Sequence, residues 1–265
     1  HLSAGQRWLT LLGPGGTGKT RLAQEYARAH TSDYPGGLWF VDMVEATSEA
    51  GFCHGLASTF DIPLTQDDPV KQLGWVLERK GRVLLILDNL EQVAEVGRSC
   101  IQRWMQMAPE VVFMVTSQVP LNDSAERCLS IEPLSSDQAS SAAVNLFVTR
   151  VKQVKPDFEL TEDNTADCVA IVQQLDGLPL AIELAAARSR LFAPKQLRDR
   201  LQKHMGFLRA RGGERPSRHA TLNAAVAWSW DLLSPAERAC LAQCSVFRGG
   251  WTLEAAEEIV ALPDD

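Results

Sequence analysis

Hydrophobic positions in the first half of the chain alternate between short apolar runs and longer stretches with helical spacing. The short runs predict five strands, at Trp8–Leu12, Leu38–Asp42, Val83–Leu87, Val111–Thr116 and Cys128–Ile131. The stretches between them predict helices at Lys19–His30, Glu49–Phe60, Val70–Arg79 and Glu91–Met107. Strands of a parallel sheet are buried on both faces and alternate in sequence with crossover helices. The pattern therefore predicts an α/β fold, in which a parallel sheet carries helices on both faces.

After Pro133 only helical periodicity remains. It predicts helices at Ala139–Val151, Asn164–Leu175 and Pro179–Leu191, and then, beyond an Arg-, Gly- and Pro-rich segment at Arg209–Arg218, at Thr221–Leu233, Pro235–Cys244 and Leu253–Ala261. The Gly- and Pro-rich segment is typical of a linker. We therefore divide the chain into an α/β domain (residues 1–132), a helical domain (133–208) and a linker followed by a third domain (209–265).

The composition excludes several classes of protein. The chain of 265 residues is 45% hydrophobic, carries a formal net charge of −7, and has six cysteines. An acidic balance provides no general positive field for nucleic acid or for an anionic membrane surface. The apolar runs are too short to span a bilayer, and the cysteines form no C-x-x-C pair. We expect a cytoplasmic protein with reduced thiols, no membrane contact and no direct nucleic-acid binding.

A phosphate-binding motif follows the first predicted strand. Residues 13–20 read Gly-Pro-Gly-Gly-Thr-Gly-Lys-Thr and match the full G-x-x-x-x-G-K-[ST] pattern, with a predicted helix directly after it. Glycines let successive backbone N–H groups surround a phosphate at the helix N-terminus. Lys19 is expected to reach the β- and γ-phosphates, and the Thr20 hydroxyl to bind Mg²⁺. The expected cofactor-binding residues here are Gly13, Gly15, Gly16, Thr17, Gly18, Lys19, Thr20 and Arg21.

Polar residues also follow the third predicted strand. Asp88 ends a buried run, which predicts either a turn cap or, together with the phosphate-binding loop, a second Mg²⁺ ligand. Many fast P-loop ATPases have a glutamate at the next position, whereas this chain has Asn89, whose amide accepts no proton. Slow hydrolysis follows as a hypothesis, and Asn89→Glu would then accelerate it. Glu91 is either the replacement base or a first-turn helix carboxylate. The candidate catalytic residues are Lys19, Asp88 and Glu91.

The fourth predicted strand leads to Gln118. A glutamine there can sense the γ-phosphate by a hydrogen bond, or it can be an ordinary polar exit from the strand. The arginines of the linker are interpreted as a solvated hinge, with phosphate or subunit contact by one of them as the alternative.

With these residues in view, the chain resembles the STAND class of signal-transduction ATPases, close to the NB-ARC type and to bacterial regulators that carry this module. The matching runs are Gly13–Thr20, Leu84–Glu91, Thr116–Ser117, Gly177–Ala181, Arg218–Leu222, Trp228–Glu237 and Cys244–Phe247. They extend over nearly the whole chain.

The resemblance implies roles for the second half. It assigns Pro179, in the Gly-Leu-Pro-Leu element, to packing against the nucleotide base, and it makes residues 209–265 the beginning of a winged-helix domain that clamps the nucleotide. Gln118 stands where the family commonly has arginine, so recognition of the γ-phosphate by charge is not expected. The implied ligands are ATP or ADP with Mg²⁺. The implied partners are other domains of the parent chain and further copies in a nucleotide-dependent homo-oligomer.

Three functions are compatible with these observations. The favoured one is an ATP/ADP-dependent switch of a multidomain signalling or transcription regulator, with slow Mg²⁺-dependent ATP hydrolysis. A winged-helix DNA-binding fragment is an alternative that the acidic charge opposes. An AAA+-type remodelling ATPase is another, opposed by Asn89 and by the Gly-Leu-Pro-Leu element.

Overall fold

A computed structural model describes residues 6–64, 68–211, 223, 226–227, 230–231, 233–247 and 251–261, with only the backbone for residues 204–211. The chain forms two compact units, His1–Pro133 and Leu134–Asp265. Within the described ranges, none of the helices combines the length and the hydrophobicity that a bilayer span requires.

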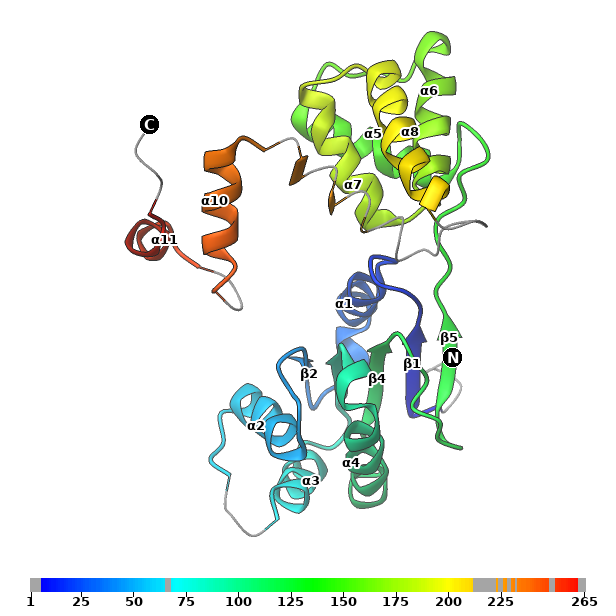
Figure 1. Ribbon diagram of the computed structural model, residues 1–265. Helices are drawn as coiled ribbons and strands as arrows, with labels where there is room; N and C mark the ends of the chain where they lie inside the picture. Colours follow the sequence, from blue (N-terminus) through cyan, green and yellow to red (C-terminus); the bar gives the residue numbers. More distant parts are fainter. Residues whose placement is uncertain are drawn as a thin grey trace. The chain divides into compact units, whose positions relative to one another are not determined.

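The first unit contains a five-stranded parallel sheet (Figure 1). Its strands are β1 (Trp8–Leu12), β2 (Leu38–Asp42), β3 (Leu84–Asp88), β4 (Val112–Ser117) and β5 (Arg127–Ser130), in the spatial order β2-β3-β4-β1-β5. All neighbouring pairs are parallel. The predicted parallel sheet is confirmed, and each strand boundary agrees with the prediction to within one residue. The carboxyl ends of β1, β3 and β4 therefore lie together at one edge, where ligands of such sheets bind.

Helices cover both faces of this sheet, as predicted. Helix α1 (Lys19–Ala29) lies on one face, and α2 (Glu49–Phe60), α3 (Pro69–Lys80) and α4 (Ala94–Met107) lie on the other. Alternate residues of β3 divide between the two faces: Leu84 and Ile86 pack with α1, whereas Leu85 and Leu87 pack with the helices opposite. The helix predicted at Glu91–Met107 is instead a 3₁₀ turn, η3 (Leu90–Val93), followed by α4.

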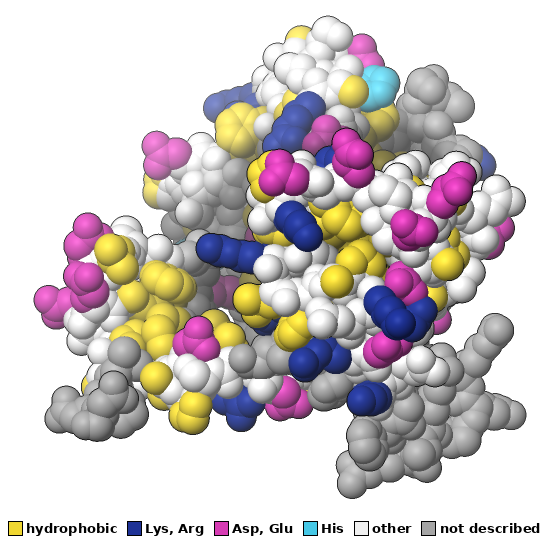
Figure 2. Space-filling view, turned by 90° about the horizontal axis from the view of Figure 1, so that it is seen from above, with side chains coloured by type: hydrophobic (Ala, Val, Ile, Leu, Met, Phe, Trp, Pro, Cys, Tyr) yellow, Lys and Arg dark blue, Asp and Glu magenta, His cyan; other side chains and the backbone are white. Residues whose placement is uncertain are grey.

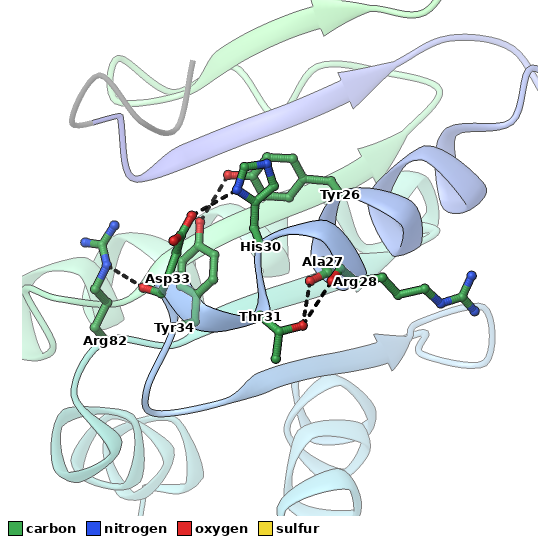
Figure 3. Close-up of polar contacts among 8 residues, drawn as sticks. All are labelled: Tyr26, Ala27, Arg28, His30, Thr31, Asp33, Tyr34 and Arg82. Atoms are coloured by element: carbon green, nitrogen blue, oxygen red, sulfur yellow. Dashed lines mark hydrogen bonds and ion pairs between the residues drawn. The ribbon is translucent and has the colours of Figure 1, made fainter.

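The far end of α1 is fixed by a polar cluster (Figure 3). The Tyr26 and Tyr34 hydroxyls lie 3.4 Å apart, and His30 Nδ1 lies 2.9 Å from Asp33 Oδ2. Arg82, just before β3, donates from Nε to the Asp33 carbonyl at 3.0 Å. Burial raises the pKa of Tyr34, so its hydroxyl stays protonated. These contacts link the C-terminus of α1, through the 3₁₀ turn η2 (Thr31–Asp33), to the residues just before β3.

The second unit is helical in its described part. It contains α5 (Ala142–Val154), α6 (Glu162–Gln174), α7 (Pro179–Ala187), η4 (Arg188–Arg190), α8 (Pro194–Arg211), α10 (Pro235–Cys244) and α11 (Leu253–Ile259). The first four α-helices share one core, which includes Phe147, Ile171, Ile182 and Leu197. The predicted helical character is confirmed here.

Several helix boundaries differ from the prediction: α5 ends at Val154 rather than Val151, α6 begins at Glu162 rather than Asn164, and α7 ends at Ala187, before η4. Helix α5 begins at Ala142 rather than Ala139, because Ser141 is the N-cap and accepts from the Val144 amide. Helix α8 was not predicted, and its backbone reaches Arg211, so the first three residues of the expected linker are helical. The rest of that linker, residues 212–218, and most of the helix predicted at Thr221–Leu233 lie outside the described residues. A winged helix remains a prediction.

Candidate functional site

The phosphate-binding loop joins β1 to α1, as its sequence predicts. Gly16 and Gly18 have φ values of 79° and 91°, in the left-handed region that favours glycine. Gly18 is the N-cap of α1. A Cβ at Gly13 would lie 2.9 Å from the Ile131 carbonyl oxygen. The glycines are therefore required by the backbone path of the loop, which turns directly into the N-terminus of a helix.

Lys19 folds back over this loop. Its Nζ donates to the carbonyl oxygens of Gly13, at 2.8 Å, and Pro14, at 3.1 Å, and the Thr17 hydroxyl donates to the same Pro14 oxygen at 2.9 Å. Only 8% of Lys19 is exposed. Burial lowers the pKa of Lys19, while the nearby Glu91 and Asp88 carboxylates raise it. The ammonium group is thus held at the loop with two carboxylates close by.

Asp88 lies at the carboxyl end of β3 and faces α1. Both of its carboxylate oxygens accept from the Thr20 hydroxyl, Oδ1 at 2.8 Å and Oδ2 at 3.0 Å, and Oδ1 also accepts from the Thr116 hydroxyl. Burial raises the pKa of Asp88, and the hydrogen bonds from Thr116 and Thr20 oppose that shift. The two predicted metal-binding side chains, Thr20 and Asp88, are therefore in direct contact.

Asn89 follows with φ 62°, again in the left-handed region. Its backbone amide donates to Thr116 Oγ1 at 3.1 Å. Its side-chain Nδ2 donates to Asp42 Oδ1 at 3.0 Å and to Asp88 Oδ2 at 3.3 Å. The amide therefore links carboxylates at the ends of β2 and β3.

Glu91 and Gln118 meet across the ends of β3 and β4. Gln118 Nε2 donates to Glu91 Oε1 at 3.0 Å. Glu91 Oε2 is buried and has no hydrogen-bond partner among the described residues. A buried carboxylate oxygen without a partner costs free energy. An oxygen in this situation is suited to accept from a water or a ligand group.

The other expected cofactor residues have separate positions. Gly15 lies within the loop, and Arg21 is exposed in the first turn of α1. Pro179 is the first residue of α7 in the second unit, where its fixed φ and missing N–H suit a helix start.

The donor set fits Mg²⁺. A threonine hydroxyl and a carboxylate are the oxygen ligands that Mg²⁺ accepts beside phosphates and water. The contact between Thr20 and Asp88 brings both donors to one point, next to the loop that would hold the phosphates.

Two residues of this edge were missed as site residues. Thr116 binds Asp88 and the Asn89 amide, and Asp42 is the register partner of Asp88 across β2 and β3. The sequence did contain a signal for Asp42, because Asp42, like Asp88, ends an apolar run. The carboxyl ends of parallel strands lie at the same sheet edge, so the two carboxylates could have been expected there together. The Thr116 contacts depend on side-chain rotamers, which the pattern does not specify.

The comparisons with known proteins agree with this geometry. A family model described as "AAA domain" matches residues 3–119. The chain is 31% identical over 266 residues to the uncharacterized protein Rv0894 of Mycobacterium tuberculosis, a match that covers 100% of this chain and 67% of that protein. It is 33% identical over 268 residues to a protein of the same organism provisionally named HTH-type transcriptional regulator Rv0890c, covering 99% of this chain and 29% of that one.

Solved structures share the fold. A STAND protein with a tetratricopeptide-repeat sensor from Pyrococcus horikoshii matches with a TM-score of 0.57 at 13% identity, covering 95% of this chain and 34% of that one. Cdc6p from Pyrobaculum aerophilum matches with a TM-score of 0.53 at 14% identity, covering 87% and 82%. These two structures show the fold alone. The match to residues 3–119 shows that the chain contains an AAA-type P-loop ATPase domain. The identity to Rv0894, over the whole of this chain and two thirds of that protein, shows that the chain belongs to the family of Rv0894.

Proposed function

We propose that this chain is an ATP/ADP-binding molecular switch of a multidomain regulator, with slow Mg²⁺-dependent ATP hydrolysis that controls assembly or an attached effector. The observation that carries the proposal is the meeting of Lys19, Thr20 and Asp88 at the N-terminus of α1. This is the arrangement that phosphates with a divalent cation require.

In this proposal the loop amides and Lys19 hold the phosphates, and Thr20 and Asp88 hold Mg²⁺. When bound, the metal would neutralise charge on the β- and γ-phosphate oxygens. Glu91 would orient the attacking water, because its Oε2 is buried and has no hydrogen-bond partner within the described part of the chain, while Gln118 Nε2 donates to its Oε1. Gln118 brings no charge to a γ-phosphate, and this supports a slow reaction.

We favour a switch over a remodelling motor for two reasons. Asn89 replaces the glutamate expected of a fast ATPase, and its amide is engaged with Asp42 and Asp88. The STAND likeness of the sequence extends to Pro179, which we propose packs against the nucleotide base. Residues 209–265 would clamp the nucleotide as part of a winged helix.

A role in transcription regulation is proposed from the relative Rv0890c, of which this chain spans 29%. We propose that DNA contact, where the parent protein makes it, belongs to other domains. On the face shown in Figure 2, acidic and basic side chains are interspersed rather than separated by sign. Together with the net charge of −7, this does not favour a DNA-binding surface.

The test is nucleotide binding measured with a fluorescent ADP or ATP analogue, in Mg²⁺ and in chelator, alongside analysis of the nucleotide that copurifies. We expect adenine nucleotide in the purified protein and tighter binding with Mg²⁺. Failure to bind either nucleotide under both conditions would refute the proposal.

A further inference from the structure

Asn89 occupies an unusual backbone position between β3 and η3. Its φ of 62° is in a region that few non-glycine residues adopt, and asparagine is among those that do. The Asn89 amide N–H is held by Thr116 Oγ1 at 3.1 Å. The side chain of Asn89 lies at the carboxyl edge of the sheet, where its Nδ2 bonds to the carboxylates of Asp42 and Asp88.

The two carboxylates face each other across neighbouring strands. Asp42 and Asp88 are register partners of β2 and β3, and like charges directly opposite each other repel. An asparagine NH₂ has two donors, and here one is shared with each carboxylate. Asp42 is itself anchored, because its Oδ1 also accepts from the Val44 amide at 3.0 Å.

We propose that Asn89 and Asp42 are positioning residues for the Mg²⁺ site. Asp42 orients the side-chain amide of Asn89, and this side-chain amide holds the Asp88 carboxylate in the orientation in which it accepts from the Thr20 hydroxyl. This role rests on the proposed function, in which Thr20 and Asp88 hold the metal. It gives Asn89 a different task from orienting water, so a glutamate at this position would add a third carboxylate beside Asp42 and Asp88 rather than supply a base.

The readout is the ratio of the affinities for a fluorescent ADP analogue in Mg²⁺ and in chelator. A merely structural defect lowers both affinities, whereas a positioning defect lowers only the first. Asn89→Gly allows the backbone to keep its left-handed conformation and removes the side-chain amide. We expect it to reduce the ratio about 10- to 100-fold, the usual effect of losing a residue that orients a metal ligand, with little change in chelator.

Variants of Asp42 test whether it acts through Asn89. Asp42→Asn retains an oxygen that accepts from Asn89 and should keep the ratio close to that of the wild type. Asp42→Ala should reduce the ratio as Asn89→Gly does, and the double variant should show no further loss, because the two residues form one chain of contacts. Equal loss in Asp42→Asn and Asp42→Ala would instead mean that the charge of Asp42 acts directly, and would overturn the assignment.

The matched control is Asn122→Gly. Asn122 also has a left-handed φ, of 60°, and its side chain bonds only to the nearby Pro120 carbonyl among the described contacts. The Asn122→Gly variant should leave the ratio of the affinities in Mg²⁺ and in chelator unchanged. An unchanged ratio in Asn89→Gly, or equal losses in Mg²⁺ and in chelator, would contradict the positioning role. A wild-type protein that binds nucleotide equally with and without Mg²⁺ would instead refute the metal site itself.

Discussion

The Thr20 hydroxyl donates to both carboxylate oxygens of Asp88, at 2.8 and 3.0 Å, across 68 residues of sequence. This contact joins the phosphate-binding loop on α1 to the end of β3. It brings the two oxygen ligands expected for Mg²⁺ together at the helix N-terminus, where the loop would place the phosphates.

Asp88→Ala should separate metal-dependent from metal-independent binding. Loss of a direct ligand should weaken nucleotide binding in Mg²⁺ by about a hundredfold or more, beyond the effect of losing a residue that only orients a ligand. Binding in chelator should change little. Titration of a fluorescent ADP analogue under both conditions measures this, and equal losses would show that Asp88 is structural.

Lys19→Ala should abolish measurable triphosphate binding while the fold remains intact. The ammonium group makes charge-assisted contacts that contribute about 1.5–3 kcal/mol each, and its only bonds to the described protein are to two loop carbonyls. Circular dichroism should match the wild type. Lys71→Ala, which removes an exposed lysine beside Trp75, is the control and should bind normally. Unchanged ATP affinity in Lys19→Ala would exclude the loop as the binding site.

Glu91→Gln should remove the residual hydrolysis without affecting nucleotide affinity. A general base contributes about 10²- to 10⁴-fold, and glutamine preserves the size of the side chain but accepts no proton. Single-turnover hydrolysis with labelled ATP is the measurement. The companion variant Asn89→Glu should not accelerate the reaction, because the position is surrounded by Asp42 and Asp88. Acceleration there would return Asn89 to the water-orienting role that the sequence suggested.

Gly177→Ala should destabilise the second unit. Gly177 has φ 64°, and an added Cβ would lie 2.1 Å from the Leu134 carbonyl oxygen. The left-handed backbone alone costs an alanine about 1–2 kcal/mol, and the clash adds to it. Gly51→Ala is the control, since it lies in α2 with its nearest contact at 3.5 Å and should raise stability slightly. Thermal unfolding compares the melting temperatures of the two variants, and hydrogen exchange of α5–α8 shows whether the loss of stability lies in the second unit. Equal melting temperatures of the two variants would contradict the expected strain.

Much of the α/β unit could be predicted from sequence because its signals are local. Buried strands such as Leu84–Asp88 read as continuous apolar runs, and the glycine-rich loop has a fixed pattern. Helix α8 was missed because it is polar at most positions, and among residues 194–203, whose side chains are described, Leu197 and Leu201 are the buried ones. Helical amphipathicity is a weak signal in such a segment.

The side-chain contacts of the site were harder to predict from the sequence. The sequence indicated Lys19, Thr20 and Asp88, because each belongs to a motif whose backbone context was predictable. It did not indicate that the Asn89 amide bonds to Asp42, since that contact depends on a left-handed φ of 62° and on the pairing of β2 with β3. Contacts of this kind require register and rotamers, which a pattern of residues does not specify.

The rate of ATP turnover by the wild-type protein tests the central claim most directly. A switch must retain its triphosphate long enough for partners to respond to it. We therefore expect multiple-turnover hydrolysis in saturating ATP and Mg²⁺ to be far below about 10 per second, the median for enzymes. A rate of tens per second would contradict the switch and favour a remodelling motor.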